Sequence, residues 1–348
     1  MKTGKTLIEL AAEITRQKDA KVDYLADTRQ MHMNDYLELG LPDLDVFGIN
    51  EIAHNQIGTK LKIPATFYDR CRTNHPDLLA HTVNTLFQRE PSRQMIRTLD
   101  GRARAFLSDR YRPIDNDAIA EAVLPIIAEW FSCGATVESC ELTDKKMYLK
   151  VVNPRIETEV VPGDIVQSGI VISNSEVGHG SVSCMPMVYR LICKNGMIRA
   201  DAGQRRIHVG RINEADSNFI LYRDETIEMD DKAFVMKLQD IVRSTADAVH
   251  FDKIVQTMRE AAGAKITSSD IPSVVQVVTK SHGLNETESE SVLNHLIRGE
   301  DLSLYGLSNA FTRTAHDVPS YDRSTELEMI GYDVLSMSRR DWNLANAA

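Results

Sequence analysis

Two segments of the chain are rich in arginine and could neutralise the phosphates of a nucleic acid. Residues 92–113 contain six arginines and two aspartates, and residues 189–211 contain five arginines, one lysine and one aspartate. Each segment also has a tyrosine next to an arginine, and aromatic rings can stack on the bases of a single strand. The predicted contact residues are Arg102, Arg104, Arg110, Tyr111 and Arg112 in the first segment, and Tyr189, Arg190, Lys194, Arg199, Arg205, Arg206 and Arg211 in the second.

Polar residues in a predicted loop offer a second kind of chemistry. The apolar run at 169–173 is followed by a loop of turn-forming and polar residues, Asn174, Ser175 and Glu176. Glycines on both sides of His179 then permit a tight reversal of the chain. An enzyme acting on nucleotides or nucleic acid would use Glu176, His179 and Asn195 as its polar groups. A structural hairpin that needs asparagine and glycine only to turn has the same pattern, so both interpretations stay open.

Motifs of the common catalytic and metal-binding classes are absent from the sequence. There is no GxSxG elbow, no HExxH helix and no GxGxxG after a strand. The five cysteines include no CxxC pair, which predicts neither a zinc ribbon nor a disulfide framework. We therefore expect no catalytic residues, no metal and no cofactor, and a binding protein rather than an enzyme.

Charge and hydropathy restrict the partners. The formal net charge of −10 argues against indiscriminate binding of nucleic acid, but the two basic segments suit a basic groove on an otherwise anionic body. No run of about 18 apolar residues and no charged-then-apolar leader occurs, so we expect no contact with a membrane and a cytoplasmic location in a bacterial host.

Hydrophobic periodicity predicts an α+β fold. Residues 1–91 form mainly helices, and an antiparallel β-sheet core with the basic segments occupies 92–215. Within this core, Asp100-Gly101 predicts a hairpin, a helix follows from about 117 to 131, and strands follow in succession. Residues 216–348 return to amphipathic helices.

Several motifs in one order resemble a known family. NSEVGHG is followed by YRLICKNGM, with RTLDGRARAFLSDRYRPIDN and IPATFYDR upstream and SNAFTRTAHD downstream. This order is similar to a phage- and plasmid-borne family known only as domain of unknown function 932, over about Ile63 to Leu335. The resemblance implies a mobile-element setting more than a reaction. One departure is Tyr305-Gly306, where the resemblance implies a bulkier aromatic residue such as tryptophan.

The predicted order of elements, a helix, then consecutive antiparallel strands, then a basic segment, is also similar to the core of phage single-strand annealing proteins of the Erf and Red beta type. That similarity implies annealing of single-stranded DNA without ATP by a homo-oligomeric ring or filament. In such a groove Asn174 to Glu176 would shape the loop between two walls. The walls would be Arg102, Arg104, Arg110 and Arg112 on one side, and Arg190, Lys194, Arg199, Arg205 and Arg206 on the other.

Two other functions stay open. One is the nucleotide- or nucleic-acid-processing enzyme described above. The other is an interaction protein, regulatory or acting against host defence, that binds a host protein through the acidic region after about Asp216.

Overall fold

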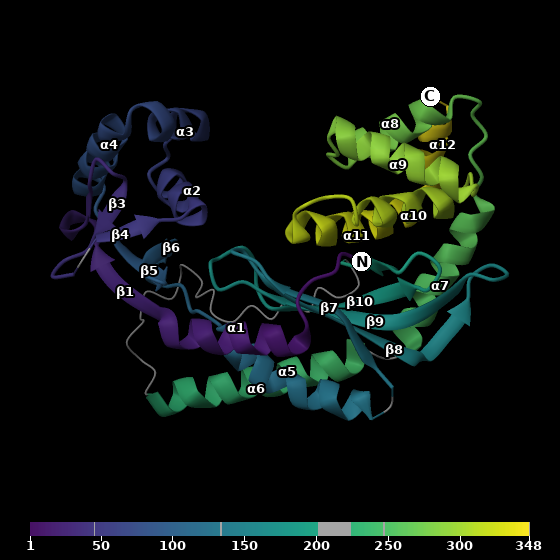
Figure 1. Ribbon diagram of the computed structural model, residues 1–348, viewed down its shortest axis with the longest axis horizontal. Coiled ribbons are helices and arrows are strands. Elements are labelled where there is room, and N and C mark those ends of the chain that lie inside the picture. Colours follow the sequence, from purple (N-terminus) through teal and green to yellow (C-terminus); the bar gives the residue numbers. More distant parts are fainter. Residues whose placement is uncertain (45, 133, 201–223, 246–247, 348) are drawn as a thin grey trace.

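The protein is built around two β-sheets (Figure 1). The computed structural model describes residues 1–44, 46–132, 134–200, 224–245 and 248–347. One sheet has six strands in the order β1-β5-β6-β4-β3-β2, and the other has five strands in the order β11-β10-β9-β8-β7. The mixed α+β class is therefore confirmed, with two sheets where the sequence predicted one.

The six-stranded sheet and three helices form what we call the N-terminal lobe. Its strands are antiparallel neighbours except for β4 and β6, which are parallel. The sheet strands are β1 (Lys21–Asp27), β2 (His32–Met33), β3 (Glu38–Gly40), β4 (Val46–Ile49), β5 (Arg93–Leu99) and β6 (Arg102–Ser108). The helices are α2 (Glu51–Lys60), α3 (Ala65–Asn74) and α4 (Pro76–Arg89), and the short 3-10 turn η1 spans Thr28–Gln30.

Residues 1–91 are mainly helical, as predicted, with α1, α2, α3 and α4. The strands β1 to β4 lie in the same range and were not predicted. Strands β2 to β4 have two to four residues each, which is too short to show a two-residue alternation in the sequence. Because β5 and β6 pair with β1 and β4, a domain boundary at residue 91 would divide this sheet.

The remaining elements form what we call the body, with the five-stranded sheet at its centre. The hairpin predicted from 169 to 187 is confirmed, because β9 and β10 are antiparallel neighbours. The body strands are β7 (Thr136–Leu142), β8 (Met147–Glu159), β9 (Ile165–Asn174), β10 (Ser183–Arg190) and β11 (Asn195–Ile198). The helices are α1 (Leu7–Ala20), α5 (Asn116–Phe131), α6 (Asp224–Thr245), α7 (Ala248–Gly263), α8 (Ile271–Ser281), α9 (Glu286–Gly299), α10 (Leu304–Thr314), α11 (Tyr321–Leu335) and α12 (Arg339–Asn346).

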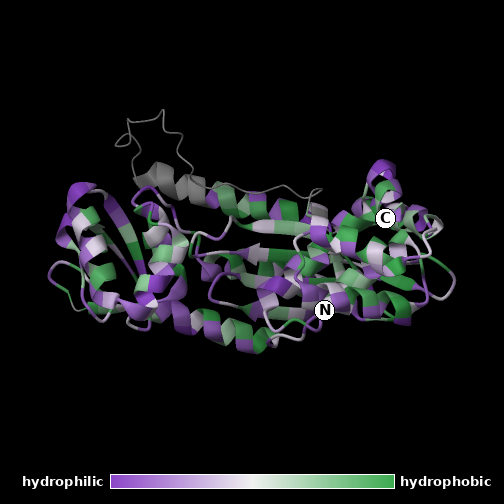
Figure 2. Cartoon of the chain, turned by 90° about the horizontal axis from the view of Figure 1, so that it is seen from above, coloured by the Kyte–Doolittle hydropathy of each residue, from purple (hydrophilic) through white to green (hydrophobic). Residues whose placement is uncertain are grey.

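Helices cover both faces of the five-stranded sheet. Apolar residues of α1, α5 and α6, among them Leu10, Ile127 and Leu238, pack on Leu149 and Ile172 of one face. On the opposite face α11 lies against β11, and the helices α7 to α12 enclose a second core. The N-terminal lobe and the C-terminal helices of the body lie at opposite ends of the molecule, as Figures 1 and 2 show in two perpendicular views.

Tyr305, where the resemblance implies a bulkier aromatic residue, lies in the core. Tyr305 is buried, and its hydroxyl donates a hydrogen bond to the Asp164 carboxylate at 2.8 Å.

Within the described residues, no helix is both long enough and apolar enough to cross a bilayer.

Candidate functional site

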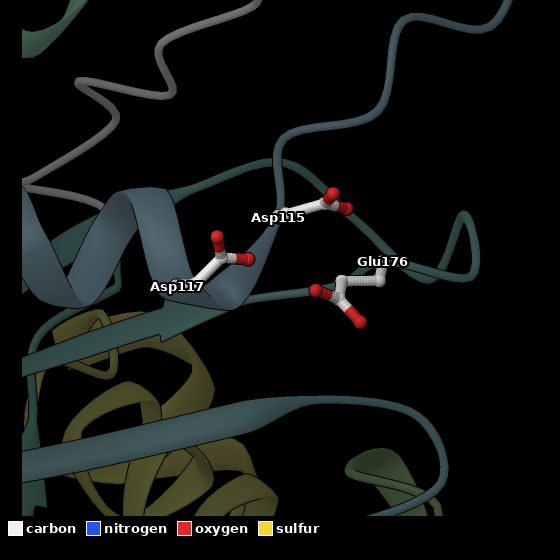
Figure 3. Close-up of side chains that lie close together, drawn as sticks. All are labelled: Asp115, Asp117 and Glu176. Atoms are coloured by element: carbon white, nitrogen blue, oxygen red, sulfur yellow. The ribbon is translucent and has the colours of Figure 1, made fainter. Parts of the chain in front are cut away.

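Three carboxylates converge where the N-terminal lobe meets the body (Figure 3). Asp115 and Asp117 lie at the start of α5, and Glu176 follows β9, so that one oxygen from each lies within 4.8 Å of the others. Asp115 is the N-cap residue of α5 but makes no side-chain cap. Glu176 fulfils that role instead, because its carboxylate accepts a hydrogen bond of 2.7 Å from the Asn116 backbone N–H.

Cations of the N-terminal lobe neutralise these carboxylates. Lys21 Nζ lies 2.8 Å from Asp115, 2.9 Å from Asp117 and 3.4 Å from Glu176. Arg104 donates to the Glu176 carboxylate. We call Lys21, Asp23, Arg97, Arg104, Asp115, Asp117 and Glu176 the junction cluster.

Arg97 is the most deeply buried member of the junction cluster, with 1% of its side chain exposed. Its guanidinium donates to Asp23 at 2.8 Å, to Asp115 at 2.7 Å and to the backbone carbonyl of Glu176 at 2.9 Å. All three acceptors lie on different segments, so one side chain ties β1, the α5 entry and the β9 exit together.

The carboxylates of the junction cluster are oxygen ligands of the type that Mg²⁺ and Ca²⁺ prefer. The position among them is taken, however, because the Lys21 ammonium contacts all three. A divalent ion would have to displace a lysine that is only 12% exposed. The arrangement is therefore that of a buried ion-pair network rather than a metal centre.

Acid should weaken the junction cluster. Burial alone would raise the pKa of Asp115, but the charges of Arg97 and Lys21 outweigh it and lower that pKa. Hydrogen bonds from Lys21 and Lys18 likewise outweigh burial and lower the pKa of Asp117. A carboxylate with a depressed pKa in the folded state contributes stability above its ordinary pKa of about 4, and that contribution is lost as the pH falls through the folded-state pKa.

We therefore predict that the urea concentration at the midpoint of unfolding decreases when the pH is lowered below about 4. Asp117→Asn should make this decrease smaller. Urea titrations of both proteins from pH 7 to pH 3 would measure it. An unchanged pH profile in the variant would contradict the prediction.

The first basic segment is only partly open to solvent. Arg102 and Arg110 are exposed, whereas Tyr111 and Arg112 are half-buried. The Tyr111 hydroxyl donates to the backbone carbonyl of Ser175 at 3.2 Å. Arg104 is 11% exposed, which corrects the prediction that it lines an open wall. It is the extra residue of a β-bulge in β6, so the two-residue alternation that placed it beside Arg102 does not hold there.

The second basic segment is also engaged in structural contacts. Tyr189 is buried, which corrects the prediction of a stacking surface. Arg190 forms an ion pair with Asp164 at 2.7 Å, and Arg199 lies over the ring of Tyr332 at 5.5 Å. Lys194 is exposed in the turn between β10 and β11. The predicted residues Arg205, Arg206 and Arg211 lie outside the described residues.

The described parts of the two basic segments do not form the walls of one groove. Arg190 pairs with Val166 near the start of β9, whereas Arg104 contacts Glu176 beyond the end of β9 at Asn174. Eight residues of extended strand separate these ends, which is about 26 Å at the usual rise per residue. Asn174 to Glu176 therefore lie beside the junction cluster and do not form a loop between the two predicted walls.

The residues predicted for an enzyme are likewise not brought together. Glu176 is 4% exposed within the junction cluster, and Asn195 is buried and donates to Thr312. Asn195 lies opposite Arg190, at the end of β10 far from His179. His179 belongs to an exposed loop. Partial desolvation of its imidazole, together with the charges of Lys145 and Lys146, lowers the pKa of this ring.

A cleft next to the β10–β11 turn contains one of the predicted arginines and two that sequence reasoning missed. Its volume is about 330 Å³, and Arg190, Arg298 and Arg313 line it. Arg298 lies in the last turn of α9, and Arg313 lies in α10. Arg313 stands inside the motif SNAFTRTAHD, which is a signal that could have found it, whereas Arg298 has no such signal. We call this site the arginine cleft; Cys193, His295, Asp301 and Asn309 are its other polar lining residues.

Of the comparisons with known proteins, only the one with family profiles found a match. No curated protein and no solved structure matched it. A family profile described as "Domain of unknown function (DUF932)" matches residues 105–295, from β6 to α9. Because this match covers more than half of the 348 residues, the chain belongs to that family of unknown function.

Proposed function

We propose that this protein binds single-stranded DNA without catalysing a reaction, and that the arginine cleft holds backbone phosphates. The observation that carries the proposal is the convergence of Arg190, Arg298 and Arg313 on one concave site. Guanidinium groups bind phosphate oxygens in a fork of parallel hydrogen bonds, which makes arginine the side chain suited to such contacts.

Charge pairing around the cleft leaves a positive surplus. Asp301 forms an ion pair with Lys265 at 3.2 Å, and the Asp317 carboxylate lies 2.7 Å from His295 Nε2, an ion pair only when the imidazole is protonated. Arg190 is neutralised by Asp164. Within the described part of the chain, neither Arg298 nor Arg313 has a carboxylate partner, and both are exposed. Arg313 donates a hydrogen bond to the backbone carbonyl of Cys193 at 2.8 Å, which leaves its charge without an anionic partner. Exposed guanidinium groups that lack a carboxylate partner can exchange small counterions for phosphates.

The residues of the arginine cleft favour contacts with the phosphate backbone of DNA over contacts with its bases. The tyrosines next to it, Tyr189 and Tyr305, are buried, and Tyr305 lies beneath Arg190 with its ring centre 5.6 Å from the guanidinium carbon. Among the described residues, no phenylalanine, tyrosine or tryptophan lines the cleft. Contacts to phosphate should therefore dominate, and binding should depend little on base sequence. A small concave site is reached more easily by a flexible single strand than by a rigid duplex.

Annealing by a homo-oligomer of a phage or plasmid protein is the wider form of this proposal. It is supported by the order of elements, in which α5 precedes the consecutive antiparallel strands β7 to β11. Fold order alone does not establish activity, so the DNA-binding step is tested first.

We expect wild-type protein to bind a fluorescent single-stranded oligonucleotide at low salt, measured by fluorescence anisotropy. Arg298→Glu/Arg313→Glu should weaken binding at least about tenfold and reduce the log–log salt slope by about 1.4, since each phosphate contact to a single strand contributes about 0.7.

The matched control is Arg339→Glu/Arg340→Glu, which makes the same charge change at exposed positions of α12. Equal losses in both double variants would show that overall charge, and not the cleft, governs binding. Absence of binding by the wild type at low salt would exclude the proposed function.

A further inference from the structure

The N-terminal lobe has a hydrophobic core of its own. That core is built from residues between Ala26 and Phe106, including Phe87 of α4 stacked on Phe106 of β6. The core under the five-stranded sheet takes its residues from α1, α5, α6 and the body strands. The two cores are separate, so each unit can keep its internal packing while its position relative to the other changes.

The apolar contact between the two units is small. Its buried members are Ile52, Ala105 and Val177, with Leu107 packed against them. Two neutral hydrogen bonds also cross the junction, from Gln56 to the carbonyl of Val177 at 2.8 Å and from Tyr111 to the carbonyl of Ser175. A contact of this size is weaker than the packing inside either core.

The chain crosses between lobe and body at points that the junction cluster clamps. Lys21 is the first residue of β1 and directly follows α1. Asp115 is the N-cap of α5, at the end of the segment that leaves β6. The ion pair between Lys21 and Asp115 therefore links the two crossing points at 2.8 Å.

In the junction cluster, the cations come from the lobe and three of the four carboxylates come from the body. Lys21, Arg97 and Arg104 come from three adjacent strands of the lobe, β1, β5 and β6. Their partners Asp115, Asp117 and Glu176 come from the α5 and β9 ends of the body. Asp23 is a lobe carboxylate that pairs with Arg97. Attraction between the units is thus concentrated in ion pairs and not in apolar packing.

From these observations we propose that the N-terminal lobe is a hinged arm, and that the junction cluster is the clasp that holds it against the body. Residues 109–115 and the α1–β1 junction are the hinge. When the side chains of Lys21, Arg104, Asp117 and Glu176 are neutralised, the small apolar contact and the two neutral hydrogen bonds remain as a pivot, while both cores stay folded. The contacts of Arg97 and the exposed ion pair between Arg16 of α1 and Asp100 of the lobe, at 2.7 Å, also remain. This proposal does not depend on DNA binding by the arginine cleft.

The test uses a charge-balanced variant, Lys21→Gln/Arg104→Gln/Asp117→Asn/Glu176→Gln. It neutralises two cations and two carboxylates together. Arg97 keeps its contacts with Asp23 and Asp115, so that no buried guanidinium is left unpaired and one ion pair between lobe and body remains. The matched control is Arg323→Gln/Glu288→Gln, which removes an ion pair inside the body. Hydrogen–deuterium exchange and small-angle X-ray scattering are measured on all three full-length proteins.

We expect amide exchange in residues 109–115 and β1 to rise at least about tenfold in the clasp variant, with a larger radius of gyration and unchanged exchange in α4 and in α5 after its first turn. The control should match the wild type. Wild-type exchange and dimensions in the clasp variant would overturn the proposal, and so would faster exchange throughout both cores. If the fourfold variant does not fold, Arg104→Gln/Glu176→Gln and Lys21→Gln/Asp117→Asn are measured separately by the same criteria.

Discussion

Replacing Lys150 by methionine should lower the free energy of unfolding by about 3–5 kcal/mol, because it leaves the buried Glu328 carboxylate without its cation. Lys150 lies in β8 and Glu328 in α11; their side chains are 0% exposed, and the Nζ–Oε2 distance is 2.5 Å. The Lys150 ammonium also lies 4.8 Å from the centre of the Tyr321 ring, which adds a cation–π contact. The other Glu328 oxygen has no hydrogen-bond partner within the described residues, so the carboxylate depends on Lys150. Urea unfolding at pH 7 would measure the loss.

Removing both charges should restore most of this stability. Lys150→Met/Glu328→Met is expected to unfold within about 1 kcal/mol of the wild type, since an apolar pair of similar volume avoids the desolvation of two ions. A double variant as unstable as Lys150→Met would show that the ion pair itself stabilises the fold. As a reference, Arg323→Met breaks the more exposed pair with Glu288 and should cost less than the Lys150 substitution.

Arg97→Met is the second substitution with a large expected effect, a loss of about 3–5 kcal/mol in the free energy of unfolding. It removes the guanidinium that joins Asp23, Asp115 and the Glu176 carbonyl, and it leaves two carboxylates with fewer partners. Arg97→Lys should recover only part of the loss, because a point-like ammonium cannot reproduce the planar fork that reaches three acceptors.

Arg102→Met is the matched control for Arg97. Arg102 begins β6 on the neighbouring strand but is exposed, so its substitution should change the free energy of unfolding by no more than about 0.5 kcal/mol. Similar losses for the two methionine variants in urea titrations would contradict the importance we assign to burial of Arg97.

Local patterns predicted the parts of the fold that depend on neighbours in the sequence. The α+β class, the helices after residue 216 and the β9–β10 hairpin follow from hydrophobic period and turn residues. Strands β2 to β4 could not be found this way, because each is short and its pairing partner is chosen by packing across the lobe. Asp100-Gly101 did predict the β5–β6 hairpin, but the bulge that reorients Arg104 has no signal in the residue types.

The sequence by itself determined the family, the fold class and the presence of two arginine-rich segments. Only the tertiary structure decided which of those charges are available. Lys21 and Asp115 are distant in the chain yet meet at 2.8 Å, and Arg298 and Arg313 come from separate helices to join Arg190. The physical reason is that residue type specifies a charge, whereas partner, burial and desolvation depend on which distant segments the fold packs together.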